Sequence, residues 1–597
     1  MAEKKTPAVK YTSRDFDTIK TELVKHAQRY YPETYKNFGE ASFGSLVLDS
    51  VAYVGDLMSF YLDYQVNELF MDTASEKTNV LRLASQLGYR YDGQPSTAGV
   101  VEVYALIPAN STGLGPDERY MPIVQSGTEI ASDAGATFTI VEDVRFDKSS
   151  NQVVVGRVDD NGTPTHYAVK ASADVVSGKN KIITITVGEY EKFKRVKILS
   201  SRLSEVISVV DAQGHEYFEV DYLSQDTIYK EIPQRDSAIA DNAPSILRPF
   251  AVLRKFVVEK ETGATYLQFG HGDSSEISTP SVAEPSKVAL QLHARGYSTD
   301  QSFDPSKLLD TDKFGISPAD TVLTITYREN DSSNVNAPVN SLNTMSSKKI
   351  RFLDSKDLST STMSSVEASL SVSNSSMIVG GMSSPTLDEI KINARDSFAT
   401  QNRAVTKTDM EAMAYGMPAK YGAIKRCASR VPHGSRRTIE FYVISQGTDG
   451  KLATASSSLK KNLKVWLNKN KMINDSIAIL DAKIMNFGIE FSIMVDSSEN
   501  KYDVLNSAMN TLKAEMKEPL YIGESLQITD IYSILNKVRG VVDTRDVKIV
   551  NKTGVNYSPT SPSVNELLSA DGLELHMPLN VVAEIKYPNS DIKGAVV

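Results

Sequence analysis

The segment from Leu48 to Gln65, LDSVAYVGDLMSFYLDYQ, constrains the fold of this chain more than any other stretch. Its spacing predicts a helix on which apolar residues occupy several neighbouring stripes, with Tyr53 and Phe60 forming one of them. A helix that is apolar over most of its circumference has to be buried by several neighbours. The adjoining predicted helices, within 12–92, are too few for this task. We therefore expect helices of another chain to complete a bundle.

Three aspartates interrupt this helix at seven-residue intervals: Asp49, Asp56 and Asp63. A rise of about 1.5 Å per residue separates successive carboxylates by roughly 10 Å, too far for two of them to share a metal ion or to act as a glycosidase pair. Two interpretations remain open. The aspartates form a solvated face, or they lie at the edge of an inter-subunit bundle and set its register. The candidate interface residues are Asp49, Asp56, Asp63, Tyr53, Phe60, Leu62 and Leu69.

A chain of 597 residues exceeds what one hydrophobic core usually supports, so several domains are expected. Runs of β-branched and aromatic residues replace the helical pattern after Thr97, and helix and strand patterns alternate after Pro385. The predicted fold class is multi-domain α+β, with an N-terminal helical segment, a β-rich middle domain and C-terminal α+β domains. The expected divisions are 1–96, helical and bundle-forming; 97–330, β-rich with an inserted lobe at about 150–260; 331–384, a Ser-rich linker or irregular β region; 385–450, α/β; and 451–597, α+β.

The clearest strand pattern lies near the C-terminus. Phe487, Ile489, Phe491 and Ile493 alternate with more polar residues. Because successive side chains of a strand point to opposite faces, this alternation predicts a sheet with one buried face.

The sequence offers little for catalysis. The single cysteine, Cys427, cannot form an internal disulfide or a cysteine-based zinc cluster, and no two of the seven histidines are four residues apart. We therefore expect no enzyme activity and no cofactor or metal. The net charge of -9 argues against nucleic-acid binding over the whole surface, and no apolar run of about 20 residues is uninterrupted, so we also expect no membrane partner.

Several motifs together resemble a known family. They are LDSVAYVGDLMSFYLDYQVNELFMDTA, NVLRLASQLGYRY, FEVDYLSQD, LQFGHG, QNRAVTKTDMEAMA and VVAEIKYPNSDIKG. This order resembles the phage baseplate J-like family, and in particular the wedge-ring proteins of T-even-type contractile tails. The most specific motif is QNRAVTKTD, which contributes Arg403, Thr406 and Asp409 as family-motif residues. Met410 departs from the aromatic residue expected there.

The resemblance implies a structural subunit of the virion tail baseplate, assembled in the host cytoplasm. Such proteins form the ring that joins wedges around the hub, and they relay the contraction signal to the sheath. The implied partners are further copies of the chain, contacting within and between wedges, another wedge protein in a 2:1 complex, and hub and sheath-proximal proteins. Residues 451–597 would be the dimerisation domain. The alternatives are a host-binding tail adhesin and a tail-associated cell-wall hydrolase.

Overall fold

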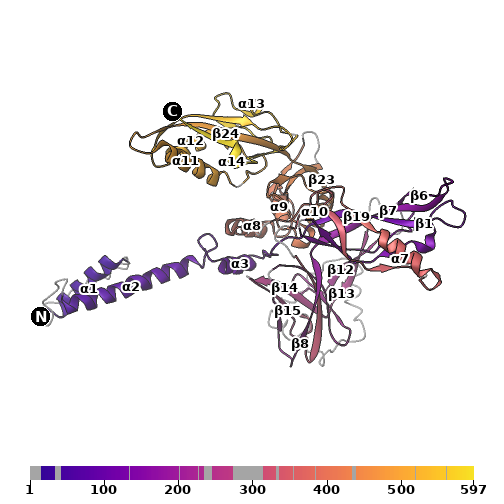
Figure 1. Cartoon of the computed structure of the whole chain (residues 1–597). Coiled ribbons are helices and arrows are strands. Elements are labelled where there is room, and N and C mark those ends of the chain that lie inside the picture. Colours follow the sequence, from indigo (N-terminus) through magenta and orange to yellow (C-terminus); the bar gives the residue numbers. More distant parts are fainter. Residues whose placement is uncertain are drawn as a thin grey trace. The chain divides into compact units, whose positions relative to one another are not determined.

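The computed structural model divides the chain into two compact units (Figure 1). One unit comprises residues 1–91 with 385–395, and the other comprises 92–384 with 396–597. The structure describes residues 15–33, 42–133, 135–200, 202–225, 227–233, 245–261, 263–272, 314–330, 335–353, 355–382, 385–432, 438–517, 519–559 and 561–597.

The first unit is helical, as the sequence predicts. It contains α1 (Phe16–Tyr30), α2 (Phe43–Asn67), α3 (Lys77–Gln86) and the first part of α8 (Leu387–Thr400). Its small core forms where α8 packs on α3, with Val80, Ala84, Ile390 and Ala394 fully buried. Residues more than 300 positions apart in the sequence therefore stabilise one corner of this unit.

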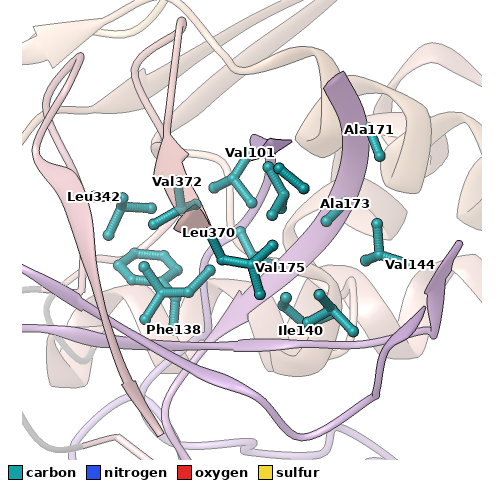
Figure 2. Packing of buried hydrophobic residues seen from close by; sticks show 14 of the residues in the cluster. Val101, Phe138, Ile140, Val144, Ala171, Ala173, Val175, Leu342, Leu370 and Val372 are labelled. Atoms are coloured by element: carbon teal, nitrogen blue, oxygen red, sulfur yellow. The ribbon is translucent and has the colours of Figure 1, made fainter. Parts of the chain in front are cut away.

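The second unit begins with a seven-stranded sheet of order β17-β3-β4-β7-β1-β19, to which β6 adds by pairing with β7. Along β1, buried and half-buried residues alternate, as expected for a strand with one face in a core. Figure 2 shows that core, where Val101, Phe138, Val175 and Leu342 converge from four strands. The strands are β1 (Ala98–Pro108), β3 (Glu129–Ser132), β4 (Thr137–Ile140), β6 (Gln152–Val158), β7 (Pro164–Ser177), β17 (Leu342–Ser347) and β19 (Ser371–Ser373).

A second seven-stranded sheet has the order β8-β16-β10-β11-β14-β15-β9. Its buried side is built around Phe256, Phe269, Leu267 and Ile325. The strands are β8 (Lys179–Val187), β9 (Arg195–Ile198), β10 (Leu203–Val210), β11 (Glu216–Glu219), β14 (Lys255–Glu261), β15 (Ala264–Phe269) and β16 (Thr321–Glu329). The hairpin of β12 (Thr227–Pro233) and β13 (Ser245–Ala251) forms a sheet of its own.

The Ser-rich stretch contributes regular elements to the first sheet region. It contains β17, β18 (Ile350–Arg351), α7 (Thr360–Ser369) and β19. The strand β18 pairs with β2 (Ile123–Val124), which also pairs with β5 (Val144–Arg145). Leu342, Leu370 and Val372 are buried in the core of that region, so a few apolar residues anchor a stretch whose composition is otherwise polar.

The next sheet joins β20 (Arg426–Arg430), β21 (Thr438–Gln446), β22 (Leu452–Ala453) and β23 (Ser476–Asp481). Two helices pack on it, α9 (Lys407–Tyr415) and α10 (Ser457–Asn470). Met410, which stands where the family resemblance predicts an aromatic residue, is buried in the shared core. Trp466 packs at the edge of the same core, and its indole Nε1–H donates to the Met413 carbonyl at 2.8 Å.

The last sheet is centred on β24 (Lys483–Val495) and includes β26 (Val541–Asn551), β28 (Val581–Glu584) and β29 (Ile592–Val596). Phe487, Ile489, Phe491 and Ile493 are buried as predicted, and the alternation holds from Ile489 to Ile493. Asn486 and Gly488 are buried as well, so the first part of the strand is covered on both faces and not on one. Helices α11 (Lys501–Glu515) and α12 (Ile528–Asn536) contribute to that core. The predicted fold class, multi-domain α+β with N-terminal helices and a β-rich middle, is confirmed.

Candidate interface on the N-terminal helices

Helices α1 and α2 contact each other, and their contact uses small or charged residues of α2. The Lys20 ammonium on α1 lies 2.7 Å from the Asp49 carboxylate on α2. A methyl group added at Gly55 would meet Ile19 Cδ1 at 3.3 Å, so α1 approaches the α2 backbone closely at this glycine. The residues of α2 that face α1 therefore have short side chains, and some of them are polar.

The three aspartates lie on this same stripe. Seven residues make nearly two helical turns, so Asp49, Asp56 and Asp63 share one direction, which they also share with Ser45 and Ala52. Ser45 and Ala52 are the two buried residues of α2, and all three aspartates are half-buried. The structure thus adds α1 as a neighbour of the stripe that the sequence singles out.

The large apolar side chains of α2 lie beside or opposite that stripe, and they are exposed. Tyr53, Phe60 and Leu62 are 61%, 63% and 61% exposed, and Leu69, just after the end of the helix, is 69% exposed. The arrangement inverts the usual amphipathic helix, in which large apolar residues face the core of their own chain. Further exposed apolar residues of this segment are Phe43, Leu46, Val47, Val51, Val54, Leu57, Met58, Tyr61, Tyr64, Val66 and Phe70.

One carboxylate fixes the corner after α2. Glu68, which is buried, accepts hydrogen bonds from the Ser75 N–H at 2.8 Å, the Ser75 hydroxyl at 2.7 Å and the Asn79 amide at 2.9 Å. Hydrogen bonds from the Ser75 and Asn79 side chains are the main reason that the pKa of Glu68 falls to about 2. The carboxylate also accepts from the N–H of Glu76, the N-cap residue of α3, whose own side chain makes no capping hydrogen bond. Glu68 is not among the residues predicted from the sequence, because a cap supplied from seven residues upstream follows no local capping rule.

The family-motif residues lie in the other unit, at the start of α9. Thr406 and Asp409 form a reciprocal capping box, in which the Thr406 hydroxyl accepts from Asp409 N–H and the Asp409 carboxylate accepts from Thr406 N–H. Burial raises the pKa of Asp409, but the hydrogen bonds from Thr406 outweigh it and the pKa ends below its ordinary value. Arg403 is exposed and donates to the Gln401 side chain at 2.6 Å. The motif therefore shapes a turn and begins a helix.

The described residues hold no group of three or more His, Cys, Asp or Glu side chains that could bind a metal ion. Cys427 is buried, and burial raises the pKa of its thiol well above its ordinary value. Such a thiol is a poor nucleophile, so the structure gives this residue a packing role.

Among the described residues, α2 is long and apolar enough to span a membrane, with a mean hydropathy of 1.2. It nevertheless carries three aspartates, and an aspartate at the centre of a membrane-spanning helix costs about 2.5–3.5 kcal/mol. The half-buried stripe that holds them is already in contact with α1. The absence of a membrane partner stays a prediction from the sequence.

The N-terminal helices resemble part of a known protein family. Residues 15–86 match the family described as bacteriophage baseplate protein, N-terminal domain. The matched segment contains α1, α2 and α3, and so includes the whole candidate interface. No curated protein matches the chain in sequence. The N-terminal helices are therefore similar to the N-terminal domain of a family of bacteriophage baseplate proteins.

Two solved structures show weak similarity. The baseplate of the anti-feeding prophage is 10% identical, with 95% of this chain and 90% of that chain covered and a TM-score of 0.25. The TssK-TssF-TssG baseplate subcomplex of the type VI secretion system is 10% identical, with 73% of this chain and 96% of that chain covered and a TM-score of 0.22. Similarity at this level does not establish a shared fold.

Proposed function

We propose that this chain is a non-catalytic structural subunit of a contractile-tail baseplate, and that its α1–α2 hairpin completes a helical bundle with helices of neighbouring subunits. The observation that carries the proposal is the outward display of large apolar side chains on α2, within a segment that matches a baseplate domain. Helices of partner chains would cover the apolar stripes, while α1 covers the stripe of aspartates.

The energetics favour such an assembly. Fully burying one Leu or Phe side chain contributes about 1.5–3 kcal/mol, and α2 exposes many of them. Obligate interfaces bury about 2,000–5,000 Å² and resemble a domain core cut in half, which fits a helix whose apolar residues face outward. Burial by partner subunits would thus supply the core that the α1–α2 hairpin lacks.

The finer role follows the family resemblance of the sequence. We propose that two copies join one copy of another wedge protein, that residues 451–597 mediate dimerisation, and that the resulting ring surrounds the hub. This ring would relay the contraction signal to the sheath. The support is the multi-domain α+β architecture, which offers several separate contact surfaces along one chain.

The test is co-expression of the full chain with the other tail proteins of its source, followed by measurement of the mass of the purified complex. We expect a stable complex, which the double substitution Phe60→Glu with Leu62→Glu abolishes because it places charges in the bundle core. The matched control is Ile473→Glu, an equally drastic change at a residue that is 98% exposed in the other unit.

Asp56→Asn with Asp63→Asn separates the two possible roles of the aspartates. If their charges help to set the register of the bundle, this variant assembles less well although the isolated chain keeps its helix content. A complex that survives the Phe60→Glu and Leu62→Glu changes would contradict the proposal, as would a wild-type chain that binds lipid vesicles through α2 and no tail protein.

A further inference from the structure

Strand β6 leaves one edge of the first sheet open. It pairs with β7 from Gln152↔Lys170 to Val158↔Pro164, and no other strand in the described part of the chain pairs with it. All its residues are exposed, including Val153, Val154 and Val155, and Val154 is 62% exposed. In an antiparallel pair, alternate residues turn their N–H and C=O groups away from the partner strand, so this edge offers unpaired backbone groups.

The two end strands of the second seven-stranded sheet carry charges that discourage pairing with another chain. Strand β8 has Lys179 and Lys181, and β9 has Arg195 and Lys197. Within β6, Arg157 is the one charged residue. Strands β17 and β19, which end the first sheet, are also uncharged, but their exposed residues are polar, so β6 is set apart by combining exposed valines with a single charge.

The irregularity of β6 is confined to its second half. The register shifts between Val155 and Arg157, and again between Arg157 and Val158. A methyl group added at Gly156 would meet Leu106 Cδ2 at 2.7 Å and Ala168 N at 3.2 Å, so the bulge brings this position close to its neighbours. The first half, Gln152–Val155, stays regular and uncharged, and only this half is suited to extending the sheet.

We propose that Gln152–Val155 pairs antiparallel with the same segment of a second copy of this chain, joining two sheets across a two-fold axis. An extended strand is the structure that satisfies the open backbone groups, and identical uncharged strands bring no like charges face to face. The charged residues that flank the strand favour antiparallel pairing over parallel pairing. Lys148 precedes the strand and Asp159 and Asp160 follow it, all exposed, so antiparallel pairing brings these opposite charges near each other at both ends, while the charge of the nearby Asp147 is paired with Arg145.

The contact is small. A stable interface buries about 1,200–2,000 Å², which a few residues of strand cannot supply. The pairing therefore acts where copies are already held close together, and in this sense it rests on the proposed function. The contact uses residues of the β-rich region, which belong neither to the proposed helical bundle nor to residues 451–597.

Cysteine cross-linking tests the contact directly. Because the single native cysteine, Cys427, is buried, an introduced surface cysteine is the reactive thiol of the chain. Directly opposed residues of antiparallel strands have Cβ atoms about 4.5–5.5 Å apart, close to the separation that a disulfide bridges. Val153→Cys, Val154→Cys and Val155→Cys are each oxidised mildly, in the full chain at high concentration and in the co-expressed complex.

We expect disulfide-linked dimers of this chain at one of the three positions, several-fold above the control Ile182→Cys on β8, which is 70% exposed. Adding Val154→Lys to the Val153→Cys chain should reduce its dimer without unfolding an exposed strand, because in the register that joins residue 153 of the two copies it places two positive charges in a diagonal pair, about 7–8 Å apart. No dimer above the control, a dimer unaffected by the lysine, or a disulfide to a different protein would overturn the inference. If the isolated chain gives dimers and the co-expression gives no complex with tail proteins, the result would support the inference and contradict the proposed function.

Discussion

At the scale of single residues, polar side chains stabilise the turns that precede two helices, α3 and α9. Glu68 joins the end of α2 to the start of α3, and the Thr406–Asp409 pair begins α9. In both places a carboxylate accepts N–H groups that a helix start leaves without intrahelical partners. A capping box has a fixed spacing and can be predicted from the sequence. The Glu68 contact has no such spacing and cannot be predicted in this way.

The lowered pKa of Glu68 makes the α2–α3 corner sensitive to acid. A carboxyl whose folded pKa is about 2, against an ordinary value of 4.5, contributes stability that is fully present above about pH 4.5. This contribution is lost as the pH falls through 2. We therefore expect Glu68→Gln to lower the helix melting temperature near neutral pH, measured by circular dichroism, and the difference from wild type to shrink towards pH 2.

Glu22→Gln is the matched control, because Glu22 makes only an exposed pair with Lys25, at 3.5 Å. Amide hydrogen exchange of residues 68–80 should accelerate in the Glu68→Gln chain and stay unchanged in the control. Equal exchange in both variants would show that the carboxylate does not hold this corner.

At the scale of elements, α2 and β24 illustrate opposite uses of apolar residues. Strand β24 turns Phe487, Ile489 and Phe491 into the core of its own chain. Helix α2 turns its small residues towards α1 and its large ones outward. Length and periodicity predict both elements, yet only the packing of α1 determines which stripe of α2 is already covered.

The α1–α2 contact depends on Ala52, which is fully buried on the stripe that faces α1. Ala52→Leu inserts three carbon atoms into this contact, and such overpacking costs about 1–3 kcal/mol. We expect α1 to loosen, seen as faster hydrogen exchange over residues 16–30. Val51→Leu, at the neighbouring exposed position, should leave exchange in α1 unchanged. Similar exchange in the two variants would show that α1 does not pack where the structure places it.

At the scale of the whole molecule, single buried side chains connect segments far apart in sequence. The Asn336 side chain accepts from Gly381 N–H at 2.8 Å and donates to the carbonyls of Gly381 and Gln446 at 2.9 and 3.0 Å. A methyl group at Gly381 would come within 2.2 Å of Val335, so this close approach requires glycine. Asn336 thereby ties the end of the Ser-rich stretch to the sheet that contains β21.

Removing this amide should weaken the second unit. Asn336→Ala leaves buried backbone groups without partners, and each such group costs about 1–3 kcal/mol. We expect a lower denaturant midpoint, followed by the fluorescence of Trp466, the single tryptophan. The exposed Asn343→Ala, which removes an amide bonded to Asp133, should leave the midpoint nearly unchanged. An unaltered midpoint for Asn336→Ala would contradict the role assigned to this residue.

Local patterns in the sequence suffice to predict the helical beginning, the β-rich middle, the α+β end and the surplus of apolar surface on α2. These features follow from periodicity, which depends on neighbours within one or two turns of helix or a few strand residues. For the same reason, the alternation within β24 is enough to assign Phe487 and Ile489 to a buried face.

Other features arise only from long-range packing: α1 contacts the aspartate stripe at Asp49, Asn336 holds Gly381, and β6 has an open edge. Each of these depends on which distant segment arrives beside the residue. Contacts of this kind bring together groups separated by many positions, and no local pattern specifies them, because their partners are fixed only when the chain packs into its cores.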